Sequence, residues 1–278
     1  MNGLYSTQPP HAALRGEQLE ALKLVEWNGL RYYQTPLQVT HGIFTRAGGV
    51  SPAPYAGLNV GGTVGDSVAN VRVNHALMYA ALRVPGELAV TTWQVHGADV
   101  VTAHAPLAYR KWHARADGII TDRRGLPLVM RFADCVPLLY HDPAHQAIGL
   151  AHAGWRGTVA GIASAMICAM QASFGSQPED VQVVIGPSIS QEHFQVGEEV
   201  VAAFERRFGK AEGLVRRDLE GRAYVDLWQA NTLELMSAGV RQIHIHTMGL
   251  CTFAQSDVFF SHRAHGGRTG RFGVVICL

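Results

Sequence analysis

The sequence predicts an α/β or α+β protein in which a mixed β-sheet is covered by helices. Short apolar runs of strand length follow one another along most of the chain, and a few longer segments with helical periodicity lie between them. Hydrophobic residues make up 47% of the 278 residues and charged residues only 16%, so the chain can bury a large core. The 30 glycines occur largely in clusters, which predicts many sharp turns between the elements.

A regular pattern begins only after residue 20. Residues 1–20 are polar and irregular, and we expect them to form a loose N-terminal segment. Residues 21–278 contain no repeat, low-complexity tract or obvious linker, which predicts a single catalytic domain. That domain opens with two apolar runs around Asn28-Gly29, a pattern typical of a β-hairpin.

The remaining elements follow from apolar periodicity and from helix-start and helix-stop residues. Strands are expected at 38–46, 117–122, 126–133, 136–142, 147–152, 181–189 and 241–249, with two more in each of 89–103 and 257–278. Helices are expected at 67–83, 158–175, 196–209 and 225–240. The long loop 47–66 is dense in glycine and proline, and loops of this length in compact domains are usually functional.

Charge and cysteine usage argue against several function classes. The net charge is +1 at pH 7 without a basic block or acidic tail, so neither nucleic acid nor membrane is indicated as a partner. The first 20 residues lack the apolar core of an export signal, and no stretch reaches the length of a membrane span. The cysteines form no C-x-x-C pair, so we interpret them as reduced and the protein as cytoplasmic. We expect Cys168 and Cys277 to lie in the core.

Three apolar runs end at a histidine or cysteine next to small residues. They are WQVHG, FADCVP and LAHAGWRG, and the residues concerned are His96, Cys135 and His152. Side chains at strand ends lie at the edge of a sheet, where a pocket can form, so these three could converge. Two imidazoles and a thiolate suit a catalytic zinc ion, which keeps three protein ligands and an open fourth position.

Other interpretations of these residues stay open at this point. A free cysteine is often an inert core residue, and His152 could equally be a buried structural histidine. Cys135 could also act as a metal-independent nucleophile with His152 or His96 as its base.

Arginines near glycines form candidate anion sites. Arg46 lies beside Gly48-Gly49, and Arg263 and Arg271 lie in a glycine-rich C-terminal loop. Arginine forks with nearby backbone N–H groups suit phosphate or carboxylate, although the same side chains could cap surface turns.

Eight motifs in order resemble the YfiH family, also called the laccase-domain, multicopper polyphenol oxidase or peptidoglycan editing factor family. The resemblance runs from about residue 38 to residue 278. The motifs are FTRAGGVS, LNVGGTVGD, TTWQVHG, ADGIITD, FADCVPLLYHDP, LAHAGWRGT, IGPSIS followed by F-x-VGEEV, and FFSHRAHGGRTGR.

The resemblance implies an α+β fold, with mixed sheets in an α/β/α layered arrangement, and a zinc-dependent purine nucleoside enzyme. Such an enzyme phosphorolyses adenosine, inosine and S-methyl-5'-thioadenosine to the free base and a ribose 1-phosphate, and it can deaminate adenosine. The matching motif positions assign the metal ligands to His96, Cys135 and His152. The expected partners are therefore a purine nucleoside and phosphate, and the expected cofactor is zinc, with copper as a second possibility. We expect a monomer or homodimer.

The family reading adds roles for neighbouring residues. Arg46, Arg263 and Arg271 would hold phosphate, and Asp134 would orient a ligand histidine. Trp155, Phe44 or Tyr55 would stack on the base. Three positions depart from the usual family pattern, namely His75, His193 and His262.

The same residues are compatible with two alternatives to the nucleoside enzyme. One is a metal-independent Cys–His hydrolase acting on another small molecule such as a cell-wall precursor. The other is a copper-binding phenol oxidase, although the sequence contains a single His-x-His pair, whereas multicopper oxidases repeat it.

Overall fold

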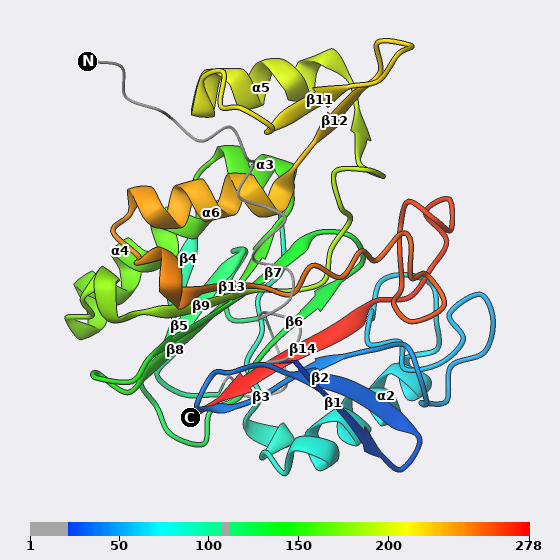
Figure 1. Ribbon diagram of the computed structural model, residues 1–278. Coiled ribbons are helices and arrows are strands. Elements are labelled where there is room, and N and C mark those ends of the chain that lie inside the picture. The colour runs from blue at the N-terminus through cyan, green and yellow to red at the C-terminus, as the bar shows by residue number, and fades with distance from the viewer. Residues whose placement is uncertain (1–21, 107–111) are drawn as a thin grey trace, which may run out of the picture.

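Two β-sheets lie face to face between layers of helices in the computed structural model (Figure 1), which describes residues 22–106 and 112–278. This confirms the predicted α+β class with mixed sheets flanked by helices. In the expected α/β/α arrangement, the β layer consists of two sheets. The segment 1–20 that we expected to be loose lies outside the described residues.

The first sheet is antiparallel throughout and has the strand order β1-β2-β3-β14-β6. Its strands are β1 (Lys23–Trp27), β2 (Leu30–Gln34), β3 (Thr40–Phe44), β14 (Phe272–Cys277) and β6 (Leu128–Phe132). The predicted hairpin at Asn28-Gly29 is confirmed, and both turn residues have the positive φ that such two-residue turns require.

The second sheet is mixed and has the order β13-β9-β7-β8-β5-β4, with parallel pairs at its two edges. Its strands are β13 (Ile245–Thr247), β9 (Gln182–Ile185), β7 (Val136–Asp142), β8 (Ala147–Ala153), β5 (Gly118–Thr121) and β4 (Val100–Thr102). Every residue of β5, β7 and β8 is buried, which explains why these strands read as continuous apolar runs.

The described residues contain five α-helices. They are α2 (Val68–Leu82), α3 (Trp155–Val159), α4 (Ile162–Phe174), α5 (Glu198–Phe208) and α6 (Leu227–Ser237), and short 3₁₀ turns lie at Gly86–Leu88, Pro178–Asp180 and Gln242–His244. All of these helices except α5 cover the outer faces of the two-sheet sandwich. One apolar cluster joins α4 and α6 to the second sheet, another fills the space between the sheets, and a third joins the first sheet to α2. Alternation along the strands produces these layers, because Leu138 and Tyr140 of β7 face the helices while Leu139 between them faces the other sheet.

A small antiparallel sheet lies with α5 at the top of Figure 1. It consists of β10 (Gln195–Val196), β12 (Ala223–Val225) and β11 (Val215–Arg217), and we did not predict it from sequence. Its strands are two or three residues long and partly polar, so they carry too little alternation to be recognised.

Several boundaries differ from the sequence-based predictions. The helix expected at 158–175 is split into α3 and α4 at Gly161, whose φ of 85° interrupts the helix, although Gly175 ends α4 as predicted. Only one strand forms in 89–103 and one in 257–278. The first half of 89–103 makes only isolated parallel bridges, at Val90 and Trp93, and the first half of 257–278 forms turns. Cys277 is buried as predicted, whereas the prediction for Cys168 is wrong, because its side chain is exposed on α4.

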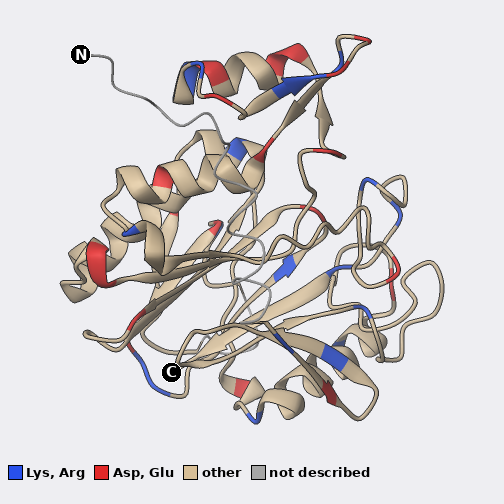
Figure 2. Cartoon of the chain, in the orientation of Figure 1, with Lys and Arg blue, Asp and Glu red and all other residues tan. Residues whose placement is uncertain are grey.

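The described residues include no helix whose length and hydropathy would allow it to cross a bilayer. Figure 2 shows acidic and basic segments interspersed over the described ribbon, with both signs present around α5 and the strands β11 and β12.

Candidate metal centre

His96, Cys135 and His152 come together at one end of the second sheet. Their ligand atoms all lie within 4.8 Å of one another. Cys135 immediately precedes β7 and His152 lies in β8, and the antiparallel pairing of Val136 with Ala153 places the two side by side. His96 comes from the loop before β4, and its ring meets that of His152 edge to face with centroids 4.8 Å apart.

Asp117, which we did not single out from sequence, organises this cluster. Its buried carboxylate accepts a hydrogen bond from Nδ1 of His152 at 2.8 Å through one oxygen. The other oxygen accepts the backbone N–H groups of Val95 at 3.0 Å and Gly97 at 2.7 Å, which flank His96. One carboxylate therefore keeps a proton on Nδ1 of His152, so that Nε2 is the atom that would bind a metal once it gives up its own proton. The same carboxylate fixes the loop that carries His96.

The backbone around the ligands is tightly constrained. His96 has a φ of 63° and Asp134, just before Cys135, has a φ of 85°, both in the left-handed region that non-glycine residues rarely adopt. A Cβ at Gly154 would lie 3.0 Å from Sγ of Cys135 and 3.0 Å from Cδ2 of His96. The glycine after the LAHA run is therefore needed for the close approach of the ligands.

The electrostatics of the cluster favour a thiolate. Burial raises the pKa of the Cys135 thiol, but the positive charge of His152 and hydrogen bonds from His152 and His96 outweigh it and lower the pKa to about 6. Burial lowers the pKa of His152, while the charge on Cys135 and the hydrogen bond to Asp117 raise it to about 9. A cation bound here would stabilise the same thiolate.

This donor set fits a metal ion. A tetrahedral zinc ion with bonds of about 2.0–2.3 Å places its ligand atoms about 3.5 Å apart, so small side-chain movements would close the cluster around it. The Nδ1–H of His152 bound to a carboxylate is the arrangement that metal-ligating histidines usually have. The three residues thus form a candidate metal site.

Asp134, which we expected to orient a ligand histidine, has other partners. Its carboxylate accepts hydrogen bonds from Oγ1 of Thr252 at 2.7 Å and from the backbone N–H of Arg263 at 2.6 Å. Its carbonyl accepts the N–H of Ile189. Asp134 thus ties the turn before Cys135 to two other loops, and Asp117 makes the contact with the histidine.

The three arginines expected to hold phosphate differ in their surroundings. Arg271 is the one whose pKa responds to the cluster: burial lowers that pKa, while the negative charges of Cys135 and Asp134 act in the opposite direction. Arg46 donates to the carbonyl oxygens of Ser256 and Ala56. Arg263 donates to the carbonyl oxygen of Gln195.

The expected base-stacking residues are less well placed. Phe44 is fully buried between the first sheet and α2, so that expectation is wrong. Tyr55 donates its hydroxyl to the carbonyl of Val64, and Trp155 lies against the guanidinium of Arg156.

Two of the three histidines that depart from the family pattern, His75 and His193, make contacts within the fold. Nε2 of His75 lies 3.1 Å from the carbonyl oxygen of Val60, and Nδ1 of His193 lies 3.6 Å from Sγ of Cys251.

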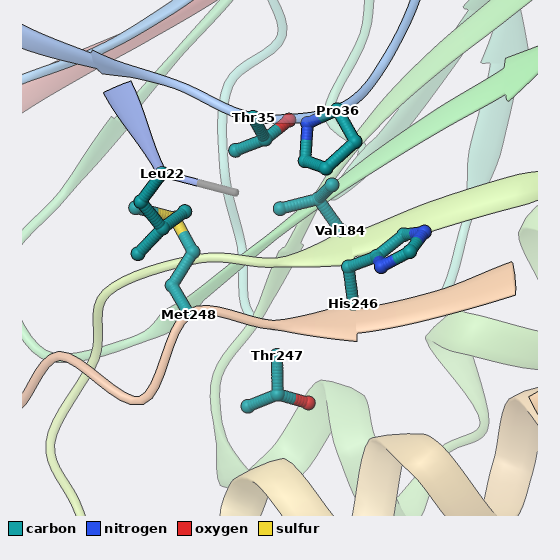
Figure 3. A pocket seen from close by; sticks show the side chains of 7 residues that line it. All are labelled: Leu22, Thr35, Pro36, Val184, His246, Thr247 and Met248. Carbon is teal, nitrogen blue, oxygen red and sulfur yellow. The ribbon is translucent and has the colours of Figure 1, made fainter. Parts of the chain in front are cut away.

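A hollow elsewhere in the fold is too small for a ligand. Figure 3 shows it where β9 and β13 meet the segment after β2. Its volume of about 10 Å³ is at the lower limit for a single water molecule. Its lining residues are Leu22, Thr35, Pro36, Val184, His246, Thr247 and Met248.

The chain is similar in sequence and in fold to known proteins. Residues 40–278 match the family described as "Multi-copper polyphenol oxidoreductase laccase". A purine nucleoside phosphorylase of Deinococcus radiodurans is 40% identical over 251 residues, 90% of this chain and 94% of that protein. One from Bacteroides thetaiotaomicron is 36% identical over 86% of this chain and 92% of its own length.

Solved structures agree with the sequence matches. YlmD from Geobacillus stearothermophilus superposes with a TM-score of 0.86 at 34% identity, covering 92% of this chain and 98% of that one. The hypothetical protein YfiH from Bacillus licheniformis superposes with a TM-score of 0.83 at 31% identity, covering 91% and 100%. The chain therefore belongs to the multi-copper polyphenol oxidoreductase laccase family, which is the YfiH family that its motifs resemble.

Proposed function

We propose that this protein is a zinc-dependent purine nucleoside phosphorylase. It would convert adenosine, inosine and S-methyl-5'-thioadenosine to the free base and ribose 1-phosphate or its methylthio analogue, and it would also deaminate adenosine. The observation that carries the proposal is the convergence of His96, Cys135 and His152 in a chain whose relatives are named purine nucleoside phosphorylases.

Each part of the centre has a role in this proposal. Bound zinc supplies Lewis-acid activation of an oxygen nucleophile near neutral pH. Asp117 holds His152 in the ligating tautomer and fixes the His96 loop, so the ligand set is organised before the substrate binds.

Phosphate binding falls most naturally to Arg271. The negative charges of Cys135 and Asp134 act on its guanidinium, which supports this assignment. A half-buried arginine stabilises an anionic nucleophile and the charge that develops during its transfer. Nη1 of Arg271 donates to the carbonyl oxygens of Thr269 and Gly270, so it would bind phosphate through its other N–H groups. Arg46 and Arg263 would complete the anion site if their backbone contacts rearranged on binding.

A metal-independent Cys–His hydrolase is the second candidate. The proximity of Cys135 to both imidazoles favours it, because a thiolate beside a histidine is the usual arrangement of a cysteine nucleophile and its base. A phenol oxidase is less well supported. The one ligand cluster within the described residues provides a single metal position, and multicopper chemistry needs several.

The test compares wild type with Cys135→Ala and with Cys168→Ala, a control that removes an exposed thiol. We expect one zinc per chain by elemental analysis in wild type and control, and phosphate-dependent release of base from inosine and adenosine. Cys135→Ala should lose both. A metal-free wild type that leaves nucleosides unchanged, but whose Cys135 reacts rapidly with iodoacetamide, would establish the hydrolase instead.

A further inference from the structure

Two exposed tryptophans form an aromatic hollow outside the cluster described above. The rings of Trp93 and Trp112 meet edge to face, with centroids 4.3 Å apart and an interplanar angle of 77°. Together with Ala114 and Arg115 they line a hollow of about 460 Å³, a volume typical of small-molecule sites. Large aromatic side chains are usually well buried, yet Trp93 is 37% exposed and Trp112 is 47% exposed. We call this site the tryptophan hollow.

The backbone connects the tryptophan hollow to the candidate metal centre. Trp93 and Arg115 are partners in a parallel β-bridge. The backbone N–H of Trp93 donates to the carbonyl oxygen of Ala114, and the N–H of Ala116 donates to the carbonyl oxygen of Trp93. Two residues further along the same two segments, the N–H of Val95 donates to the carboxylate of Asp117. Because a residue advances the chain by at most about 3.3 Å, the backbone of the hollow lies within about 10 Å of His96 and Asp117. A nucleoside can span this interval.

The chemistry of the hollow suits a planar base with hydrogen-bond acceptors. An indole face can stack on any nucleobase, because every base has a π-face. Arginine carries only donors, and within residues 22–106 and 112–278 the Arg115 guanidinium has no hydrogen bond or ion pair. The N7 and O6 atoms of a 6-oxopurine are both acceptors and match an arginine fork, whereas a 6-aminopurine presents a donor at position 6.

We propose that the tryptophan hollow binds the purine base of the substrate, with one indole stacking on the face of the ring, the other meeting its edge, and Arg115 donating to N7 and O6. This inference rests on the proposed nucleoside phosphorylase function and identifies a determinant of base preference for that reaction. Arg115 favours 6-oxopurine nucleosides such as inosine over adenosine in phosphorolysis, in which C1′ rather than C6 faces the candidate centre; deamination of adenosine requires the reverse orientation.

The test measures binding without phosphate, so that no turnover occurs, and then steady-state kinetics with phosphate. The variants are Trp93→Ala, Trp112→Ala and Arg115→Met in the full-length protein, with Trp93→Phe as a conservative substitution. Matched controls are Arg241→Met and Ile243→Ala, two exposed side chains next to β13, at the opposite edge of the second sheet from β4. Calorimetry and quenching of tryptophan fluorescence report binding of inosine, adenosine and ribose 1-phosphate.

We expect each tryptophan-to-alanine change to raise the Kd and KM for inosine about tenfold, with Trp93→Phe restoring most of the affinity. Arg115→Met should raise the KM for inosine about tenfold and that for adenosine less than threefold. Affinity for ribose 1-phosphate, which has no base, should not change, and the controls should match wild type.

The measurements distinguish a failure of this inference from a failure of the proposed phosphorylase function. If wild type releases base from inosine while all three variants bind it normally, the phosphorylase function stands and this inference is overturned. If inosine binds through the hollow but phosphate releases no base, the inference stands and the proposed reaction is wrong. A parallel loss of ribose 1-phosphate affinity, or a change of oligomeric state in the tryptophan variants, would also overturn it.

Discussion

The two histidines of the candidate centre are held in contrasting ways. His152 lies in a buried central strand and is almost completely inaccessible, whereas His96 is exposed on a loop with a left-handed backbone. Strand packing and the hydrogen bond to Asp117 fix the first, whereas hydrogen bonds from the neighbouring backbone to Asp117 hold the loop of the second. A side chain at the start of a rigid strand can thus position a residue on a nearby loop.

The largest effect is expected from Asp117→Asn, because Asp117 links His152 to the loop that carries His96. The asparagine oxygen must still accept the N–H groups of Val95 and Gly97, so its NH₂ group would face Nδ1 of His152. This would move the imidazole proton to Nε2, the ligand atom. We expect zinc affinity to fall 10- to 100-fold and the free energy of unfolding to fall by about 2–3 kcal/mol, measured by zinc titration and chemical denaturation.

The same variant has a pH signature. Burial raises the pKa of Asp117, but hydrogen bonds from His152 and the backbone outweigh it and lower the pKa below its ordinary value. The stabilisation is therefore complete above about pH 4 and is lost as the pH falls through the folded-state pKa. The stability difference between wild type and Asp117→Asn should shrink in acid, and a constant difference down to pH 2 would contradict this account.

Alanine substitutions of the two histidines should separate their structural roles. In metal-free protein, His152→Ala removes a buried ring and leaves the Asp117 carboxylate without one donor, so we expect a loss of about 2–3 kcal/mol of unfolding free energy. His96→Ala changes an exposed side chain with a left-handed backbone and removes its hydrogen bond to Cys135, and it should cost about 1 kcal/mol. Denaturant titration of both variants checks this. Equal losses of unfolding free energy would contradict the difference in how His152 and His96 are held.

Gly154→Ala should weaken metal binding without unfolding the protein. The backbone φ of −73° accepts alanine, but the new Cβ would press on Cys135 and His96 at 3.0 Å. We expect about a tenfold loss of zinc affinity with a nearly unchanged melting temperature. Gly62→Ala, where a Cβ meets no atom within 4 Å, is the matched control. Unchanged affinity in Gly154→Ala would show that the ligands are free to move apart.

The smallest effect on the metal is expected from Asp134→Asn. Its partners are Thr252 and the backbone of Arg263 rather than a ligand, so the variant should keep its zinc and lose about 1 kcal/mol of stability. Elemental analysis and thermal denaturation test this. Loss of the metal would restore the role for Asp134 that its position next to Cys135 suggests.

The convergence of His96, Cys135 and His152 could be predicted from sequence because each ends an apolar run in a motif of the family. Asp117 could not, because its contact with His152 joins positions 35 residues apart and depends on the pairing of β5 with β8. The available signal was the ADGIITD motif, in which a buried strand begins directly after an acidic residue. A carboxylate at such a position needs partners, and neighbouring strands must supply them.

The fold, like the candidate centre, could be predicted only in part from the sequence. Long apolar strands and capped helices were recognisable, whereas pairing between distant strands and the short strands β10, β11 and β12 were not. The break between α3 and α4 had a local signal in Gly161, which small apolar neighbours on both sides obscured.

The position of β14 between β3 and β6 has a consequence for biosynthesis. Strands β1, β2 and β3 leave the ribosome early, but β3 meets its second neighbour, β14, only when residues 272–277 have been made. Until then the nascent chain carries an unpaired strand edge beside apolar surface, a hazard for aggregation that slow non-local pairing prolongs. Substitutions in β14 should therefore reduce the yield of soluble protein more than its stability once folded would indicate.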